Sequence, residues 1–300
     1  MLDYKGLQAL ATVVQEGGFE RAAKVLFISQ SAVSQRVKQL EQKTGEALLI
    51  RSNPVETTAA GNRLLRHFQQ VSLLEAELGH ERGEEVALAQ SKIQIAVNAD
   101  SLATWFMPSL NALFDRRDWL LDLIIDDEGE THKLLKDGKV IGCVTTEAHA
   151  LPGCRSDYLG TMIYSCVCNR SFKARYFADG MTPAALQKAP GVVFSVKDEM
   201  HHRYLQQHHN MAPGQWQYHR IPSSESFLEL IVNGFGYGLV SHLQAKPLIE
   251  QQRLIELEPD KQMKVPLYWQ HWNIKAPQTT LIYRALSATA RRYLLQEPTP

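Results

Sequence analysis

The chain has 300 residues, of which 44% are hydrophobic and 21% charged, and its formal net charge is zero. This composition is typical of a globular protein of two or three domains and excludes a chain that is strongly basic or acidic as a whole. The opening stretch MLDYKGLQAL lacks the apolar core of a secretory leader, and no uninterrupted apolar run reaches the ~18 residues of a membrane span. We therefore expect a cytoplasmic protein with no membrane partner.

The four cysteines are too few and too late in the chain for a disulfide framework. They are Cys143, Cys154, Cys166 and Cys168. We expect reduced, partly buried thiols. Cys166 and Cys168 alternate along the predicted strand YSCVCN and could face one side, but no second pair stands at metal-ligand spacing. The sequence therefore predicts neither a metal site nor a cofactor.

Three short helices are predicted at the N-terminus. The first covers residues 5–15, where apolar side chains recur at helical spacing, and Gly17-Gly18 ends it. The run FERAAKVLF supplies the second helix, and a tight turn at Ile28 and Ser29 follows it. Ser29 is the predicted N-cap of a third helix that continues to Thr44, with Gly45 at its C-terminal end.

The third helix has two unlike sides. Its apolar stripe consists of Val33, Val37 and Leu40, whereas the opposite side carries Ser31, Ser34, Gln35 and Lys38. Between Arg21 and Arg51 six basic residues stand against two acidic ones, so the segment has a net charge of +4 on a neutral chain. After the helix, ALLIRSNPVETT predicts two short strands, a wing. A plain three-helix bundle is the alternative; we favour a winged helix-turn-helix that binds double-stranded DNA.

The run FERAAKVLFISQSAVSQRVKQLEQKTGEALLIR, followed by TTAAG, resembles the DNA-binding domain of LysR-type transcriptional regulators. The AA, SQSAVSQ, LE, G and L-x-R elements follow the order and spacing of that family. The resemblance implies that one set of side chains faces DNA: Ser29, Gln30, Ser31, Ser34, Gln35 and Lys38 from the third helix, and Arg51 from the wing. Gln and Lys have suitable donors for base edges, whereas Arg51 is better placed for a phosphate.

A long helix is predicted from Thr57 and Thr58 to about Ala89. Leu64, Val71 and Leu78 recur at intervals of seven with Phe68 and Leu74 between them, which is the spacing of a coiled coil. The helix could instead lie on the surface of its own domain. We expect it to pair two subunits, and the resemblance implies a homodimer and beyond it a homotetramer of paired dimers.

From Lys92 onward strands alternate with helices, which predicts a parallel sheet covered on both faces. The predicted fold class is α/β with an all-α winged helix-turn-helix N-terminus and a two-lobed effector domain like a periplasmic binding protein, the last part implied by the resemblance. The expected domains are residues 1–58, a linker of residues 59–90, and an effector domain of residues 91–300. Its first lobe covers about 91–161 and 268–300, and its second about 162–267.

Ligands of such sheets bind beyond the carboxyl ends of strands, next to helix N-termini. This rule selects ten candidate effector-binding residues: Asp100, Ser101, Leu102, Asp126, Asp127, Glu128, Thr145, Ser223, Ser224 and Glu225. Ser101 and nearby backbone N–H groups could hold a carboxylate, and the acidic run could hold a cation. The serines could equally be only N-caps, and residues 126–128 a solvated turn.

The strings VNADSLATW and SSESF are similar to a subgroup of the family that senses lysine and arginine. The resemblance therefore implies a basic amino acid as the small-molecule effector. That subgroup is also associated with inhibition of chromosome replication initiation. One departure stands out, because GYGLVSHL has Ser241 where the family usually has proline.

The sequence does not favour a zinc-binding protein or an enzyme. The pairs His201-His202 and His208-His209 lack the i, i+4 spacing of a zinc helix, so a solvated polar face is expected there. No nucleophile elbow, phosphate loop or zinc motif indicates an enzyme. The leading hypothesis is a ligand-responsive transcription regulator, and the alternative is a DNA-architectural or replication-control protein with a vestigial effector domain.

Overall fold

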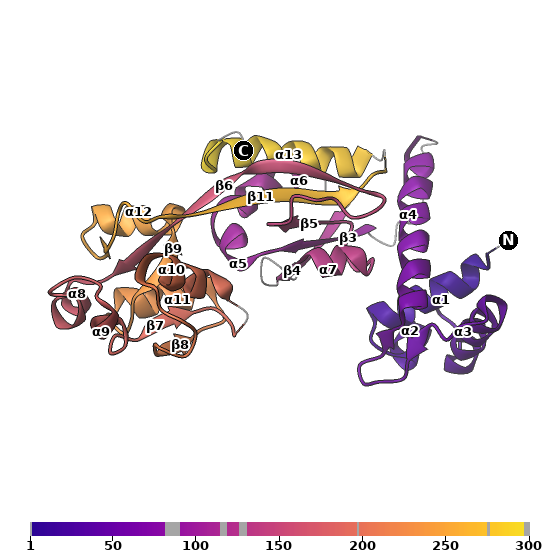
Figure 1. The fold of residues 1–300 in the computed structure, drawn as a ribbon. Coiled ribbons are helices and arrows are strands. Elements are labelled where there is room, and N and C mark those ends of the chain that lie inside the picture. The colour runs from indigo at the N-terminus through magenta and orange to yellow at the C-terminus, as the bar shows by residue number, and fades with distance from the viewer. Residues whose placement is uncertain are drawn as a thin grey trace.

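The structure is a computed structural model that describes residues 2–81, 91–114, 119–125, 131–196, 198–274 and 277–296. An N-terminal head and a long helix lie at one end of the molecule, and two α/β lobes extend away from them (Figure 1). Among the described residues no helix is both long enough and apolar enough to cross a membrane.

The head contains three helices and a two-stranded wing, as predicted. These are α1 (Tyr4–Gln15), α2 (Phe19–Val25), α3 (Gln30–Thr44), β1 (Leu49–Ile50) and β2 (Glu56–Thr57). The Ser29 hydroxyl accepts a hydrogen bond from the Ala32 N–H and so caps α3. Gly45 ends the helix in the left-handed conformation at φ 73°. The local sequence thus sets both ends of α3.

The predicted apolar stripe of α3 is the side that packs inward. Val33 and Val37 lie in a buried cluster with alanines of α1 and α2, and Leu40 joins a second cluster that includes Leu7 and Leu65. Burying three aliphatic side chains of this size contributes roughly 1.5–3 kcal/mol each. Because this packing fixes the rotation of α3 about its axis, its polar side faces away from the head.

The long helix α4 (Ala59–Glu81) begins after Thr58, whose hydroxyl accepts from the Gly61 N–H. Residues 82–89 of the predicted helix lie outside the described residues. Phe68 packs against the core of the head, Leu73 packs against the core of the two lobes, and Leu74 is exposed. Some apolar side chains of α4 thus pack within the chain, whereas Leu74 does not. Pairing of two subunits through α4 stays a prediction.

The helix α4 also touches the lobes through backbone. A Cβ atom added at Gly138 would lie 2.9 Å from Arg66 Cβ and 3.1 Å from Arg66 Cα. Gly138 has φ 73°, in the left-handed region that favours glycine. It stands in the turn after α7 (Thr131–Lys136). Only a residue without a side chain fits this close contact.

A mixed sheet forms the centre of the lobes. Its strands are β3 (Ser91–Val97), β4 (Trp119–Ile125), β5 (Gly142–Thr145), β6 (Cys154–Cys168), β9 (Gly238–Ser241), β10 (Ile255–Glu256) and β11 (Met263–Trp272). The order is β10-β6-β11-β5-β3-β4, and β9 also pairs with β6. In this sheet β3, β4 and β5 are parallel, in agreement with the parallel sheet predicted for the first series of strands, whereas β6 and β11 run antiparallel.

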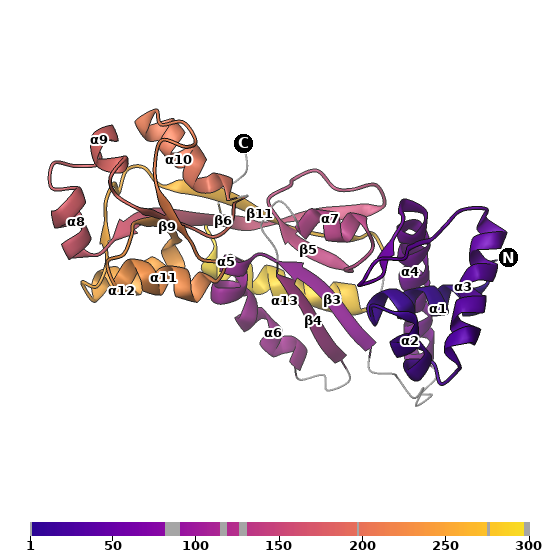
Figure 2. The ribbon, with the colours of Figure 1, turned by 90° about the horizontal axis from the view of Figure 1, so that it is seen from below.

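We call lobe I the part built on β3, β4 and β5. Its helices are α5 (Ala99–Ser101), the π-helix η1 (Leu102–Phe106), α6 (Met107–Phe114), α7 and α13 (Pro277–Tyr293). Lobe II is built from α8 (Arg170–Tyr176), α9 (Pro183–Leu186), β7 (Gly191–Val193), α10 (Glu199–His209), β8 (Tyr218–Arg220), α11 (Ser224–Val232), β9 and α12 (His242–Glu250). Figure 2 shows β6 and β11 running from one lobe to the other. The domain and lobe boundaries by residue number stay predictions.

The sequence predicted that the histidine pairs of α10 form a solvated polar face, and this prediction is wrong. His201 is buried, its Nε2 accepts from the Leu239 N–H, and its ring stacks on Trp216. His209 contacts the Glu258 carboxylate at 2.8 Å. The helix turns this side toward the rest of lobe II because Tyr204 and Leu205 on it are buried. All four cysteines are free, and Cys143, Cys166 and Cys168 are buried, in agreement with the predicted thiols.

Candidate DNA-binding and effector sites

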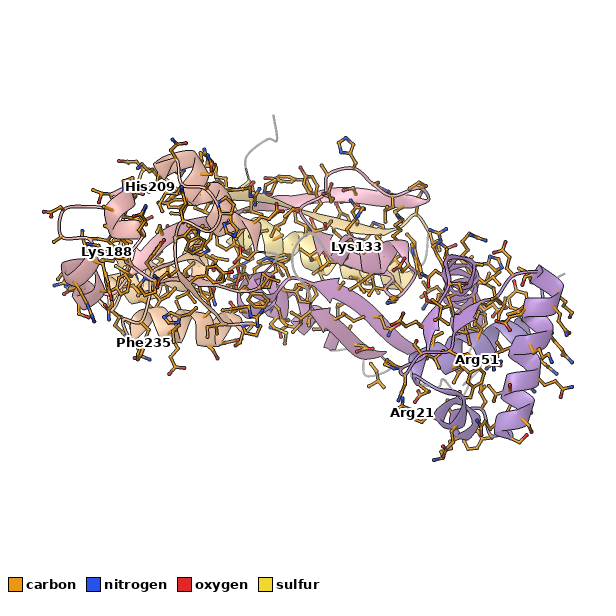
Figure 3. The ribbon with its side chains drawn as sticks, turned by 60° about the horizontal axis from the view of Figure 1, so that its bottom comes forward. Arg21, Arg51, Lys133, Lys188, His209 and Phe235 are labelled. Carbon is orange, nitrogen blue, oxygen red and sulfur yellow. The ribbon has the colours of Figure 1, made fainter. Side chains whose placement is uncertain are left out.

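The polar side of α3 is open to solvent. All seven candidate DNA-contacting residues are exposed: Ser29, Gln30, Ser31, Ser34, Gln35, Lys38 and Arg51. Arg36, which the helical wheel places off this side, is half-buried. Figure 3 shows Arg51 and Arg21 on the head, while Lys188, His209 and Phe235 lie on lobe II at the far end. The head therefore presents hydroxyl, amide and ammonium groups together on one unobstructed surface.

The turn before α3 has a feature that the sequence did not reveal. Phe27 adopts a left-handed backbone with φ 53° and is 94% exposed. Bulky residues rarely take this conformation. The turn demands it because α2 must stop and α3 must start within a few residues. A lone aromatic residue in LFIS gave no sign of this geometry.

One candidate effector contact joins the two lobes directly. Asp100 lies in α5, beyond the carboxyl end of β3, and Ser224 is the first residue of α11. The Ser224 hydroxyl donates to Asp100 Oδ1 at 2.7 Å, and the Tyr164 hydroxyl donates to Oδ2 at 3.0 Å. Both oxygens of the carboxylate are therefore held, one from lobe II and the other from the shared strand β6.

The surroundings of Asp100 disfavour negative charge. Burial raises the pKa of Asp100, the hydrogen bonds from Ser224 and Tyr164 oppose that rise, and the carboxylates of Asp198 and Glu225 raise the pKa further. Asp198 precedes α10, and Glu225 is exposed on α11. A cation placed near Asp100 would relieve this repulsion, so the arrangement suits a ligand with an ammonium or guanidinium group.

The remaining candidate effector residues are more scattered. Ser101 is fully buried, and its hydroxyl accepts from the Trp105 indole N–H at 3.1 Å, so its side chain belongs to the core here. Leu102 packs against the same core. Thr145 is buried at the end of β5, and its hydroxyl accepts from the Glu147 N–H. Residues 126–128 lie outside the described residues. A carboxylate contact at Ser101 stays a prediction.

The second-lobe serines have different roles. Ser223 caps α11 by accepting from the Ser226 N–H, and it also donates to Glu225. Ser224 reaches across to Asp100 and in turn accepts from Gln244. Tyr164 and Gln244 were not among the predicted residues, because they meet Asp100 and Ser224 only through the tertiary fold. No group of three or more potential metal ligands occurs in the part of the chain that the structure describes.

The comparisons with known proteins agree with this architecture. Residues 4–62 match the family described as bacterial regulatory helix-turn-helix protein, lysR family, and residues 87–290 match the LysR substrate binding domain. The chain therefore belongs to the LysR family and is a LysR-type transcriptional regulator.

Its similarity to individual relatives spans nearly the whole length. It is 42% identical to the HTH-type transcriptional regulator ArgP of Aeromonas salmonicida, over 98% of each chain. The crystal structure of ArgP from Mycobacterium tuberculosis has a TM-score of 0.87 at 37% identity and covers 99% of this chain and all of that one. Full-length LysG from Corynebacterium glutamicum with bound effector Arg has a TM-score of 0.78 at 34% identity, covering 98% and 100%. The resemblance to an ArgP-like subgroup is confirmed.

Proposed function

We propose that this regulator senses a basic amino acid, lysine or arginine, between its two lobes and changes its binding to DNA in response. The observation that carries the proposal is Asp100, a half-buried carboxylate of lobe I that is held by Ser224 of lobe II and by Tyr164 of the shared strand β6. A cationic ligand beside it would be bound by groups that move with different lobes. Such a ligand changes the relative position of the two lobes if it binds one arrangement of the lobes more tightly than another.

The chemistry of the site and the relatives support the same ligand class. The carboxylates of Asp100, Asp198 and Glu225 act on one another, which favours a positively charged group among them. LysG, a relative over nearly the full chain, has a structure with bound effector Arg. We assign the DNA contacts to the exposed residues of α3 and to Arg51. No cofactor and no catalytic group forms part of the proposal.

Titration calorimetry of the full chain tests the ligand class. We expect binding heat with lysine or arginine and at least tenfold weaker binding of norleucine, which keeps the amino-acid head and lacks the side-chain cation. Equal affinities for lysine and norleucine would contradict recognition of the side-chain cation. No heat with either basic amino acid would favour the alternative, an architectural or replication-control protein with a vestigial effector domain.

We further propose that the protein acts in the cytoplasm, where its DNA lies, as a homodimer paired through α4 and as a homotetramer of paired dimers. The exposed Leu74 and the half-buried Val71 on α4 support a second helix there. Sedimentation velocity should show a dimer or tetramer at micromolar concentration. A monomer under those conditions would contradict the pairing.

A further inference from the structure

A chain of hydrogen bonds runs from the base of lobe II to Asp100. The Ser241 hydroxyl donates to Gln244 Oε1 at 2.9 Å, and Gln244 Nε2 donates to Ser224 Oγ at 3.3 Å. Ser224 then donates to Asp100 Oδ1 at 2.7 Å. We call Ser241, Gln244 and Ser224 the relay. Each member donates toward the next, and the carboxylate is the final acceptor.

The direction of the relay follows from the acceptor at its end. An ionised carboxylate has no proton to give, so Ser224 must donate its only proton to Asp100. The Ser224 oxygen is then free to accept, which requires the amide N–H of Gln244 on that side. The amide oxygen of Gln244 must therefore point to Ser241. One ionised group thus orders three side chains.

The position of Ser241 shows that the relay has replaced an ordinary structural role. Ser241 is the N-cap residue of α12, and Gln244 stands three residues later, which is the spacing of a capping box. Yet the Ser241 side chain makes no capping hydrogen bond to the helix and donates to the Gln244 side chain instead. Ser241 is fully buried, so water does not explain this choice.

Ser241 of the relay and Tyr164 are neighbours on adjacent strands of the sheet. Ser241 is paired with Tyr164 in the register of β9 against β6. From this pair, Tyr164 reaches Asp100 Oδ2 directly, and the relay reaches Oδ1 by way of α12 and α11. The two oxygens of the Asp100 carboxylate are therefore both oriented by side chains that start from the same pair of strands, β6 and β9.

From this geometry we propose that Ser241 and Gln244 are positioning residues of the effector site, which hold the Ser224 proton on Asp100 and so keep that carboxylate ionised and aimed at a cationic ligand. The inference rests on the proposed function. The charged and titratable groups that act on Asp100 are Asp198 before α10, Glu225 on α11 and Tyr164 on β6. Because Asp198 and Glu225 disfavour the ionised form of Asp100, the hydrogen bonds from the Ser224 and Tyr164 hydroxyls are needed to stabilise its negative charge.

The test compares Ser241→Ala, Ser241→Thr and Gln244→Met with the wild-type chain, and Ser226→Ala serves as the matched control. Ser226 is an exposed serine on α11 outside the relay. At pH 7.5, we expect Ser241→Ala and Gln244→Met to bind lysine or arginine about three- to tenfold more weakly. The pH at which affinity falls on acidification should move up by about half a unit. Ser241→Thr, which keeps a hydroxyl, and Ser226→Ala should match the wild type in both measurements.

The outcomes separate the inference from the proposed function. If the wild type binds a basic amino acid and Ser241→Ala binds it with the same affinity and pH profile, the relay has no role and the inference is overturned. If the wild type binds neither ligand, the proposed function fails. In that case a titration of the Asp100 carboxyl carbon by NMR, without ligand, still decides the relay. An unchanged Asp100 titration in Ser241→Ala would reject it, and a titration moved to higher pH would support it.

Discussion

Replacing Gln35 by alanine is expected to lower affinity for the specific DNA site by about 10- to 100-fold, as the loss of roughly 1–3 kcal/mol of base discrimination requires. Affinity for unrelated DNA should stay within about twofold, because phosphate contacts supply most of that binding. Gln35 is exposed on α3, on the side opposite Val33 and Val37. Fluorescence anisotropy with specific and scrambled duplexes, at one salt concentration, measures both affinities.

The matched control is Gln42→Ala. Gln42 is also exposed and lies two turns further along the same side of α3. Recognition helices contact bases mainly through their N-terminal residues, so this change should have little effect on specific binding. An equal loss on specific and scrambled duplexes for Gln35→Ala would defeat its assignment to a base. A larger loss for Gln42→Ala would place the DNA against the other end of the helix.

Replacing Asp100 by asparagine is expected to weaken lysine or arginine binding by about 10- to 100-fold, since a charge-assisted hydrogen bond contributes roughly 1.5–3 kcal/mol. Stability should change in the opposite direction. The pKa of Asp100 is raised in the folded protein, so the stability linked to its protonated form is present at low pH and lost as the pH rises through that pKa. Near neutral pH, Asp100→Asn should therefore unfold no more readily than the wild type.

Two measurements separate lost recognition from damaged structure. Calorimetry gives the affinity, and urea unfolding at pH 7 and pH 4 gives the free energy of unfolding. Any advantage of Asp100→Asn should shrink on acidification, as the wild-type carboxyl takes up a proton. Asp179→Asn makes the same change of net charge at an exposed position of lobe II and should alter neither measurement. Wild-type affinity in Asp100→Asn would exclude this carboxylate from the site.

The head could be predicted closely because its determinants are local. The cap at Ser29, the stripe of Val33 and Val37, and the turn at Gly45 all lie within one helix and its ends. The exposure of Gln35 then follows from the burial of the opposite side. The left-handed Phe27 escaped prediction because a lone aromatic residue carries no turn pattern.

The effector site could be predicted only in part because distant segments build it. Asp100 and Ser224 follow from their places beyond a strand and before a helix, whereas Tyr164 and Gln244 depend on how β6 and α12 pack. The π-helix from Leu102 to Phe106 has no recognisable sequence pattern, although it contains Trp105, whose indole N–H donates to the Ser101 hydroxyl. His201 is buried by partners 15 and 38 residues away along the chain, Trp216 and Leu239, which a helical wheel does not show.

The contact of Gly138 with Arg66 couples any movement of lobe I to the long helix α4. Because Gly138 has no side chain, its backbone lies directly against Arg66, and a small displacement of lobe I is passed on to α4. Arg66 is seven residues, about 10 Å of helix, from Ala59 at the head end of α4, so a tilt of about 10° at the contact would carry that end by roughly 2 Å. Successive base pairs are about 3.4 Å apart along each strand, so such a tilt would shift the DNA-binding head by about half a base-pair step.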